Sequence, residues 1–231
     1  NYEQLLDEHS DEEPIFEVDH DDPLMMMYTS GTTGRPKGAL LTHGNTIWNA
    51  VNFIVSVPFQ SDDLTLTVAP LFHIGGMNIF TTPTLYKGGT ILLQDQFHPV
   101  DVLKAVEREK VTTLFLVPAM WQAITQVPNF DDYDLNSLRL LVSGGATCPI
   151  TVIEFFQNRG YPFIEGFGLT ETAPFVALLD NENSIRKNGS VGKPPIHVDV
   201  KIVDEFEQEV EVGEVGELIV RGPNIFKEYC N

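Results

Sequence analysis

Basic residues are scarce in this chain. It holds 14 Lys and Arg against 33 Asp and Glu, which gives a formal net charge of -19. Because nucleic-acid binding depends on Lys and Arg that neutralise phosphates, this composition argues against a nucleic-acid partner. The stretches 1–23 and 204–217 contain no Lys or Arg, whereas 24–203 carries 15 acids and 12 bases. The nearly balanced central stretch can still receive an anionic ligand.

Cysteines and long apolar runs are also few. The two cysteines, Cys148 and Cys230, show neither zinc-ligand spacing nor a disulfide framework, so we expect a reducing, cytoplasmic location. No apolar run approaches the ~20 residues of a membrane span, and the acidic, polar start does not resemble a signal peptide. Because Asn1 stands where an initiator Met would be, we expect the chain to be cut from a longer protein. Apolar residues, 42% of the total, permit a sizeable core.

Short apolar runs alternate with amphipathic segments along the chain. We expect strands at 24–29, 64–69, 90–94, 112–117, 138–142 and 162–165. Several of these runs are continuously apolar, as in strands covered on both faces. Helices are expected at 99–110 and 149–159, which begin with Pro, and less distinctly at 45–57 and 118–127. This alternation predicts an α/β fold with a mostly parallel sheet and flanking helices.

The sequence changes in character near residue 189. A turn-rich joint, GSVGKPP, is followed by VDVKIVD and GELIVRG, which are typical of short alternating strands. We therefore divide the chain into 1–23, an acidic linker or arm, 24–188, an α/β subdomain, and 189–231, the start of a β-rich subdomain.

Glycine-rich loops follow the expected strands. In open parallel sheets, ligands bind beyond the carboxyl ends of the strands. The loops at those ends read TSGTTGRPKG, APLFHIGG, VPAMW, SGGATCP and EGFGLTET, and four of the five contain glycine. Several glycine-rich loops in these positions indicate a ligand site more specifically than any one of them.

The stretch YTSGTTGRPKG, residues 28–38, is the richest of these loops in small donors. Backbone N–H groups of such a loop can form a nest for phosphate oxygens, and its hydroxyls and Lys37 add further donors. It is not a nucleoside-triphosphatase P-loop, because Pro36 stands where that motif needs Gly. An ordinary surface turn remains the alternative.

The loop EGFGLTET, residues 165–172, combines an aromatic ring, a hydroxyl and a carboxylate. Phe167 could stack on a base, Thr170 could donate to a phosphate, and Glu171 could hold Mg²⁺ together with substrate phosphates. The alternative is a strand-to-helix turn in which Thr170 is the N-cap.

Two further loops offer weaker signals. Gly144 and Gly145 could lie flat against a planar ligand, or could form the turn before a helix that starts at Pro149. Cys148 is better explained as a small packed residue than as a nucleophile. His73, in PLFHIGG, could be a pocket wall or gate, or a structural histidine.

Taken together and in this order, YTSGTTGRPKG, SGGA, GFGLTET and GELIVRGP closely resemble the motifs of the adenylate-forming superfamily. Its members include acyl- and aryl-CoA synthetases, peptide-synthetase adenylation domains and luciferases. The resemblance runs from about residue 24 to the end. It implies that a carboxylate attacks the α-phosphate of ATP, with Mg²⁺ present, to give an acyl-adenylate and pyrophosphate. A thiol, usually that of CoA, then displaces AMP; fixed donors and Mg²⁺ stabilise the developing charge.

The resemblance also implies roles for individual residues. The ATP-binding set would be Thr29, Ser30, Gly31, Thr32, Thr33, Gly34, Lys37, Gly144, Gly145, Ala146, Phe167, Gly168 and Thr170. Phe167 stands where the family usually has Tyr, so stacking on adenine is kept and one polar contact is lost. Thr170 would bind the α-phosphate, Glu171 would bind Mg²⁺, and His73 would gate the acyl pocket.

The chain departs from the family pattern at its ends. The family continues past GELIVRGP to a TGD-type motif, a hinge and a C-terminal domain with a lysine for adenylation, and it also has a part before the phosphate loop. We therefore expect an excised central piece of a larger ligase that by itself binds ATP weakly and turns over little. Such a piece should expose core-type surface, so a homodimer is a further expectation.

The acid substrate is less well specified. PLFHIGGMN and GSVGKPP resemble bacterial fatty-acyl-CoA ligases most, which makes a fatty acid the first expectation. An aryl or o-succinylbenzoate-type CoA ligase, a carrier-protein adenylation domain and a non-catalytic nucleotide-binding module remain alternatives. An acyl channel could be lined by six apolar residues that could equally be plain core: Ile74, Met77, Phe80, Phe115, Met120 and Trp121.

Overall fold

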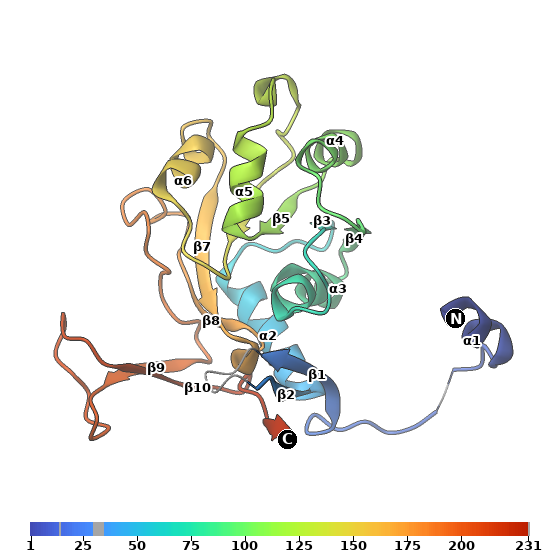
Figure 1. Ribbon diagram of the computed structural model, residues 1–231, viewed down its shortest axis with the longest axis vertical. Helices are drawn as coiled ribbons and strands as arrows, with labels where there is room; N and C mark the ends of the chain where they lie inside the picture. Colours follow the sequence, from blue (N-terminus) through green and yellow to red (C-terminus); the bar gives the residue numbers. More distant parts are fainter. Residues whose placement is uncertain (14, 30–34, 231) are drawn as a thin grey trace.

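A six-stranded sheet lies at the centre of the structure, a computed structural model that describes residues 1–13, 15–29 and 35–230 (Figure 1). The strands, in the order β4-β3-β5-β6-β7-β8, are β3 (Leu64–Thr67), β4 (Thr90–Leu93), β5 (Thr113–Leu116), β6 (Leu140–Ser143), β7 (Phe163–Gly168) and β8 (Phe175–Leu178). Neighbouring strands are parallel except for β7 and β8. The predicted α/β fold with a mostly parallel sheet is confirmed.

Helices cover both faces of this sheet (Figure 1). One face carries α4 (Pro99–Glu109), α5 (Pro118–Thr125) and α6 (Ile150–Gln157). The other carries α2 (His43–Ser56), the π-helix η1 (Gly76–Thr81) and α3 (Thr82–Lys87). Along β5, Leu114 and Leu116 point to the first face and Phe115 to the second. Because both faces are covered, every residue of β5 and β6 is buried, which explains their unbroken apolar runs.

A second, antiparallel sheet holds β1 (Pro23–Thr29), β2 (Lys37–Thr42) and β11 (Glu228–Cys230). Our grouping of 24–29 with the parallel strands was therefore wrong. Parallel neighbours need a crossover of a dozen or more residues, whereas only the short segment 30–36 joins β1 to β2, so the two strands pair antiparallel. Thr29 and Lys37, which flank the stretch richest in hydroxyls, consequently belong to a different sheet from the central one.

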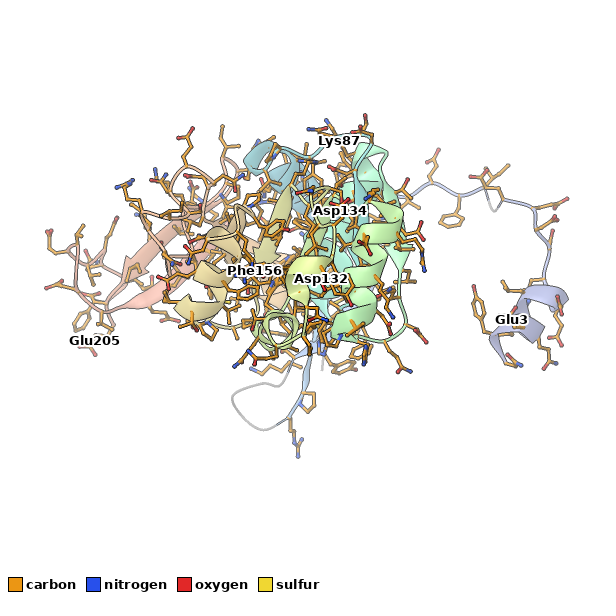
Figure 2. All side chains as sticks on the ribbon, turned by 90° about the horizontal axis from the view of Figure 1, so that it is seen from above. Glu3, Lys87, Asp132, Asp134, Phe156 and Glu205 are labelled. Atoms are coloured by element: carbon orange, nitrogen blue, oxygen red, sulfur yellow. The ribbon has the colours of Figure 1, made fainter. Side chains whose placement is uncertain are left out.

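The remaining elements lie at the two ends of the chain. The β9 (Asp199–Val203) and β10 (Glu217–Arg221) strands form an antiparallel ribbon, as expected for 198–204 and 216–222. Figures 1 and 2 show α1 (Tyr2–Glu8), which buries no residue, away from the body of the chain and on the side opposite to this ribbon. Because β11 pairs with β2, the predicted segment 189–231 is hydrogen-bonded to the predicted segment 24–188. The division of the chain near residue 189 stays a prediction.

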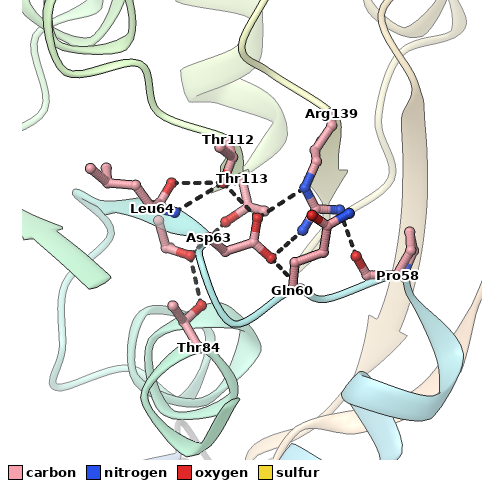
Figure 3. A network of polar contacts seen from close by, with 9 residues as sticks. Pro58, Gln60, Asp63, Leu64, Thr84, Thr112, Thr113 and Arg139 are labelled. Atoms are coloured by element: carbon pink, nitrogen blue, oxygen red, sulfur yellow. Dashed lines mark hydrogen bonds and ion pairs between the residues drawn. The ribbon is translucent and has the colours of Figure 1, made fainter. Parts of the chain in front are cut away.

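The edge of the central sheet opposite the strand carboxyl ends is held by a buried carboxylate (Figure 3). Asp63, just before β3, accepts hydrogen bonds from Thr112 Oγ1 at 2.7 Å, just before β5, and from Arg139 Nε at 2.9 Å, just before β6. The Arg139 guanidinium also donates to the carbonyl of Pro58 at 2.6 Å. One carboxylate thus sets the starting points of three neighbouring strands. Within the described residues, no helix is both long and apolar enough to cross a membrane.

Candidate functional site

A cavity of about 650 Å³ opens where β5, β6 and β7 end. Its walls come from the connection between β3 and η1, the loop after β6, strand β7 with the 3-10 turn η3 (Thr170–Thr172), and β8. A second 3-10 turn, η2 (Phe130–Asp132), lies elsewhere in the chain. Parallel strands bring their following loops to one edge, which is where a ligand site is expected in an open α/β sheet.

The cavity gathers many of the predicted site residues. Eight of them line it: Thr29, His73, Gly144, Gly145, Phe167, Gly168, Thr170 and Glu171. Ala146 is exposed and does not line it. Lys37 is not part of the wall either, and its Nζ lies 5.2 Å from the ring centroid of Tyr229. Ser30, Gly31, Thr32, Thr33 and Gly34 lie outside the described residues. The roles given to all these residues stay predictions.

Close backbone approach explains two of the glycines. A Cβ at Gly168 would lie 1.7 Å from the carbonyl oxygen of Pro174, a distance that no side chain can tolerate. A Cβ at Gly144 would lie 3.3 Å from the carbonyl oxygen of Gly166 and 3.4 Å from the Phe115 ring. Glycine therefore lets the loop after β6 and the end of β7 close tightly around the cavity.

The polar end of the cavity is built around Glu171. Its Oε1 accepts a hydrogen bond from the Tyr229 hydroxyl at 2.6 Å, and its backbone carbonyl accepts one from Phe226 N at 2.8 Å. The bond to the carboxylate raises the pKa of Tyr229 to about 12, so the phenol keeps its proton at neutral pH. Residues 55 and 58 positions apart in sequence from Glu171 thus meet at this one residue.

Buried asparagines hold the turn that carries Thr170 and Glu171. Asn224 Nδ2 donates to the carbonyls of Thr172 at 2.6 Å and Phe175 at 2.9 Å. Asn49 Oδ1, on α2, accepts from Phe175 N at 3.2 Å. Since Asn49 and Asn224 are fully buried, these amides satisfy backbone groups that water cannot reach. The turn is therefore held by α2 on one side and by the segment before β11 on the other.

The opposite end of the cavity is apolar. Of the six side chains considered for an acyl channel, Ile74, Phe115 and Met120 line it. All six pack against the hydrophobic core, but Met77, Phe80 and Trp121 do not line the cavity, so for these three the core alternative fits better. A ligand with a polar, phosphate-bearing part and an apolar part would match the two ends of the cavity.

A buried carboxylate that we did not single out supports the loop after β6. Glu165, on β7, is 6% exposed, and its Oε1 accepts a hydrogen bond from Cys148 N at 3.3 Å. Burial raises the pKa of Glu165 above its usual value. Burial also raises the pKa of the Cys148 thiol to about 11, which agrees with a packed, unreactive cysteine.

Replacing Glu165 by Gln should reduce the pH dependence of stability. Because the folded-state pKa lies above the unfolded value of 4.5, ionisation opposes folding, and the wild type loses stability as the pH rises from about 4.5 through the raised pKa. The melting temperature of Glu165→Gln should therefore gain on that of the wild type between pH 4 and pH 8. The exposed Glu154→Gln on α6 is the control. A gap between Glu165→Gln and the wild type that stays constant over this range would contradict the assignment.

The site fits a divalent cation bound together with phosphates better than a cation bound by protein alone. The described residues contain no cluster of three or more His, Cys, Asp or Glu side chains able to hold a metal. Glu171 is a single carboxylate on the cavity wall. Mg²⁺ is commonly held by one or two carboxylates plus substrate phosphates and water, and Glu171 meets the protein share of that requirement.

Two supporting residues escaped prediction for different reasons. Glu165 lies within the predicted strand at 162–165, so a charged residue in an otherwise apolar strand was a usable signal. Tyr229 reaches Glu171 only because β11 pairs with β2. No local sequence pattern predicts a contact between residues 58 positions apart.

Comparisons with known proteins agree with this geometry. A family model described as AMP-binding enzyme matches residues 1–230. A feruloyl-CoA synthase of Amycolatopsis sp is 46% identical over 224 residues, 97% of this chain and 46% of that protein. A Mycobacterium tuberculosis fatty acyl CoA synthetase structure matches with a TM-score of 0.91 and 29% identity, over 99% of this chain and 44% of that one.

A further similar structure was solved with ATP and magnesium bound. The o-succinylbenzoate coenzyme A synthetase of Bacillus subtilis, in complex with ATP and magnesium ion, matches with a TM-score of 0.85 and 33% identity. The match covers 98% of this chain and 47% of that one. The chain spans about half the length of the curated relatives it matches.

Proposed function

This chain belongs to the AMP-binding enzyme family, and on that premise we propose that it supplies the nucleotide- and acid-binding part of an AMP-forming CoA ligase. The reaction would join a carboxylic acid to CoA with ATP, through an acyl-adenylate, and release AMP and pyrophosphate. The observation that carries the proposal is the two-ended cavity. Thr170 and Glu171 share its wall with the apolar side chains of Phe115 and Met120. CoA ligases among the relatives and neighbours support the same reaction class.

In this proposal the chain's own groups bind and orient the reactants. Thr170 donates to the α-phosphate that the carboxylate attacks, and Phe167 packs on the adenine. Glu171 would hold Mg²⁺, which would neutralise phosphate charge as it develops. Lys37 and the loop before it would contact the triphosphate. His73, exposed on the wall at the entrance to η1, would control access to the acyl end between the two half-reactions.

The acid we propose is hydrophobic, and two classes have support. An aromatic acid is supported by the 46% identity to a feruloyl-CoA synthase and by the Phe53 and Phe115 rings in the cavity wall. A fatty acid, our first expectation from the sequence, is supported by the TM-score of 0.91 to a fatty acyl CoA synthetase. Both classes place an uncharged tail among apolar side chains.

ATP–pyrophosphate exchange with a panel of aromatic and fatty acids tests the proposal. It is measured on the longest natural protein that contains this chain, beside the 231-residue chain itself. Exchange that depends on one acid class would support the ligase and identify its substrate. Calorimetry with acyl-sulfamoyl adenosines, which combine both ends of the adenylate, tests binding by the chain alone. If neither exchange nor binding is observed with any acid, the proposal is overturned in favour of a non-catalytic module.

Val117→Phe should narrow the apolar end of the cavity. Val117 lies half-buried in the wall at the end of β5, so a larger ring there would occupy ligand space. We expect acyl-sulfamoyl adenosines with an aromatic or long acyl group to bind about 10-fold or more weakly, because pocket contacts are worth ~1–3 kcal/mol each. The acetyl analogue should bind as to the wild type. Val55→Phe, on the exposed side of α2, is the matched control, and equal losses for acetyl and bulky analogues would contradict the assignment.

A cytoplasmic location and a homodimer are further proposals. The dimer is supported by exposed apolar side chains on the β9–β10 ribbon, among them Ile202, Leu218 and Ile219. Light scattering that gives the mass of a monomer at all concentrations would overturn the dimer.

A further inference from the structure

Tyr229 contacts two predicted triphosphate-site residues of opposite charge, Glu171 and Lys37. Its hydroxyl donates to Oε1 of Glu171 at 2.6 Å. Nζ of Lys37 lies over the face of the Tyr229 ring, 5.2 Å from the ring centroid. A carboxylate from η3 and an ammonium from β2 are therefore joined through one phenol from a third element, β11.

Backbone pairing holds the phenol in this position. Tyr229 lies opposite Ala39 in the β11–β2 register, two residues from Lys37 on β2. On the other side, Phe226 N donates to the backbone carbonyl of Glu171 at 2.8 Å. The Phe226 and Tyr229 rings also touch edge to face, with centroids 4.7 Å apart. The segment 226–229 is thus held at both ends, by η3 at Phe226 and by β2 at Tyr229.

We propose that Tyr229 is a positioning residue for the metal–triphosphate site, where it orients the Glu171 carboxylate toward the cation and the Lys37 ammonium toward the phosphates. This rests on the proposed nucleotide-binding function. The hydroxyl donates to Oε1, and the second carboxylate oxygen, Oε2, would face the cation. Hydrogen-bond partners of this kind fix a ligating carboxylate and tune its metal affinity.

The two contacts of the phenol have different chemistry, so they can be separated. The contact to Glu171 requires the hydroxyl, and Tyr229→Phe removes it while keeping the ring. The contact to Lys37 uses the negative face of the ring, and only a substitution such as Tyr229→Leu removes it. Loss of the hydroxyl should therefore reduce the effect of Mg²⁺ on ATP binding. Loss of the ring should in addition weaken ATP binding even without Mg²⁺.

A purely structural role does not explain the hydroxyl. The side chain is 41% exposed, so the hydroxyl is not needed to fill the core. The pairing of β11 with β2 uses backbone groups, which Tyr229→Phe leaves in place. A positioning role predicts instead that the effect depends on the partner: once Glu171 is replaced by Gln, removing the hydroxyl should matter little.

Calorimetric titration of ATP into the 231-residue chain, with Mg²⁺ and with EDTA, tests the proposal. The ratio of the two dissociation constants measures how much Mg²⁺ improves ATP binding. Tyr229→Phe should lower this ratio about 10-fold, the lower end of the range for such partners, because the site is partly exposed. Tyr229→Leu should in addition weaken ATP binding in EDTA by about 2- to 5-fold. Tyr86→Phe, which removes another exposed phenol on α3, should change neither quantity.

Each outcome decides something. If the wild-type chain binds ATP in neither condition, this inference is overturned for the chain, and ATP–pyrophosphate exchange by the longest natural protein decides separately whether the proposed function falls with it. If the wild type shows the Mg²⁺ effect and Tyr229→Phe keeps it, the positioning role alone is overturned. The same holds if Tyr229→Phe causes the full loss in a Glu171→Gln background. A melting curve of Tyr229→Phe that matches the wild type excludes unfolding as the cause of a lowered ratio.

Discussion

Gly168→Ala should abolish ATP binding and destabilise the fold by about 3 kcal/mol, near the upper end for overpacked sites. The new Cβ would lie 1.7 Å from the carbonyl oxygen of Pro174, so that carbonyl has to move by more than 1 Å. The same oxygen accepts hydrogen bonds from Leu169 N at 3.1 Å and from Thr172 Oγ1 at 2.6 Å. These bonds close the turn that carries Thr170 and Glu171, so displacing the carbonyl opens the polar end of the cavity. Urea denaturation and ATP calorimetry measure the two effects.

Gly160→Ala provides a comparison that isolates the close approach. Gly160 has φ +83, but a Cβ there would meet no atom within 4 Å. Its cost should be limited to the left-handed backbone, about 1–2 kcal/mol, and ATP binding should be unchanged. If Gly168→Ala costs no more than Gly160→Ala, or binds ATP as the wild type does, the close approach of Gly168 to the Pro174 carbonyl does not hold the polar end of the cavity.

Asp63→Ala should cost about 3 kcal/mol or more without changing the affinity of the folded chain for ATP. Asp63 is 1% exposed and is bonded to Arg139, Thr112 Oγ1 and, at 2.7 Å, the backbone N of Gln60 (Figure 3). Removing one member of a buried ion pair leaves the other charge and its hydrogen-bond donors without a partner. The network lies at the strand ends opposite the cavity, so the effect should be on stability alone. Urea denaturation and ATP calorimetry separate the two quantities.

Asp134→Ala is the matched control for a charge removed at the surface. Asp134 pairs with Lys110 at 2.7 Å, but both side chains are largely exposed to water. Exposed pairs contribute little, because water and salt screen them. The stability of Asp134→Ala should therefore stay close to that of the wild type. Equal losses for Asp63→Ala and Asp134→Ala would show that burial of the Asp63 carboxylate is not what makes its network important.

Local patterns were sufficient for elements whose burial is set by the central sheet. The apolar runs at 112–117 and 138–142 became β5 and β6, because strands covered on both faces can hold almost no polar side chain. The α4 and α6 helices began within a residue of their predicted starts, where Pro sets the backbone angle of a first turn. The strand at β2 was missed, because KGALLT is short and follows a loop that we read as leaving a parallel sheet.

The sequence by itself determined the α/β class, the glycine-rich loops at the carboxyl ends of the strands and the hydroxyl and carboxylate residues within those loops. These follow from hydrophobic period and from turn chemistry, which act over a few neighbouring residues. Tertiary structure alone decided that β1 pairs antiparallel with β2, that Glu165 anchors the loop after β6, and that Tyr229 joins Glu171 to Lys37. Such contacts depend on how distant segments pair and pack. The free energy that selects them comes from many contacts across the whole core, so no single position in the sequence indicates them.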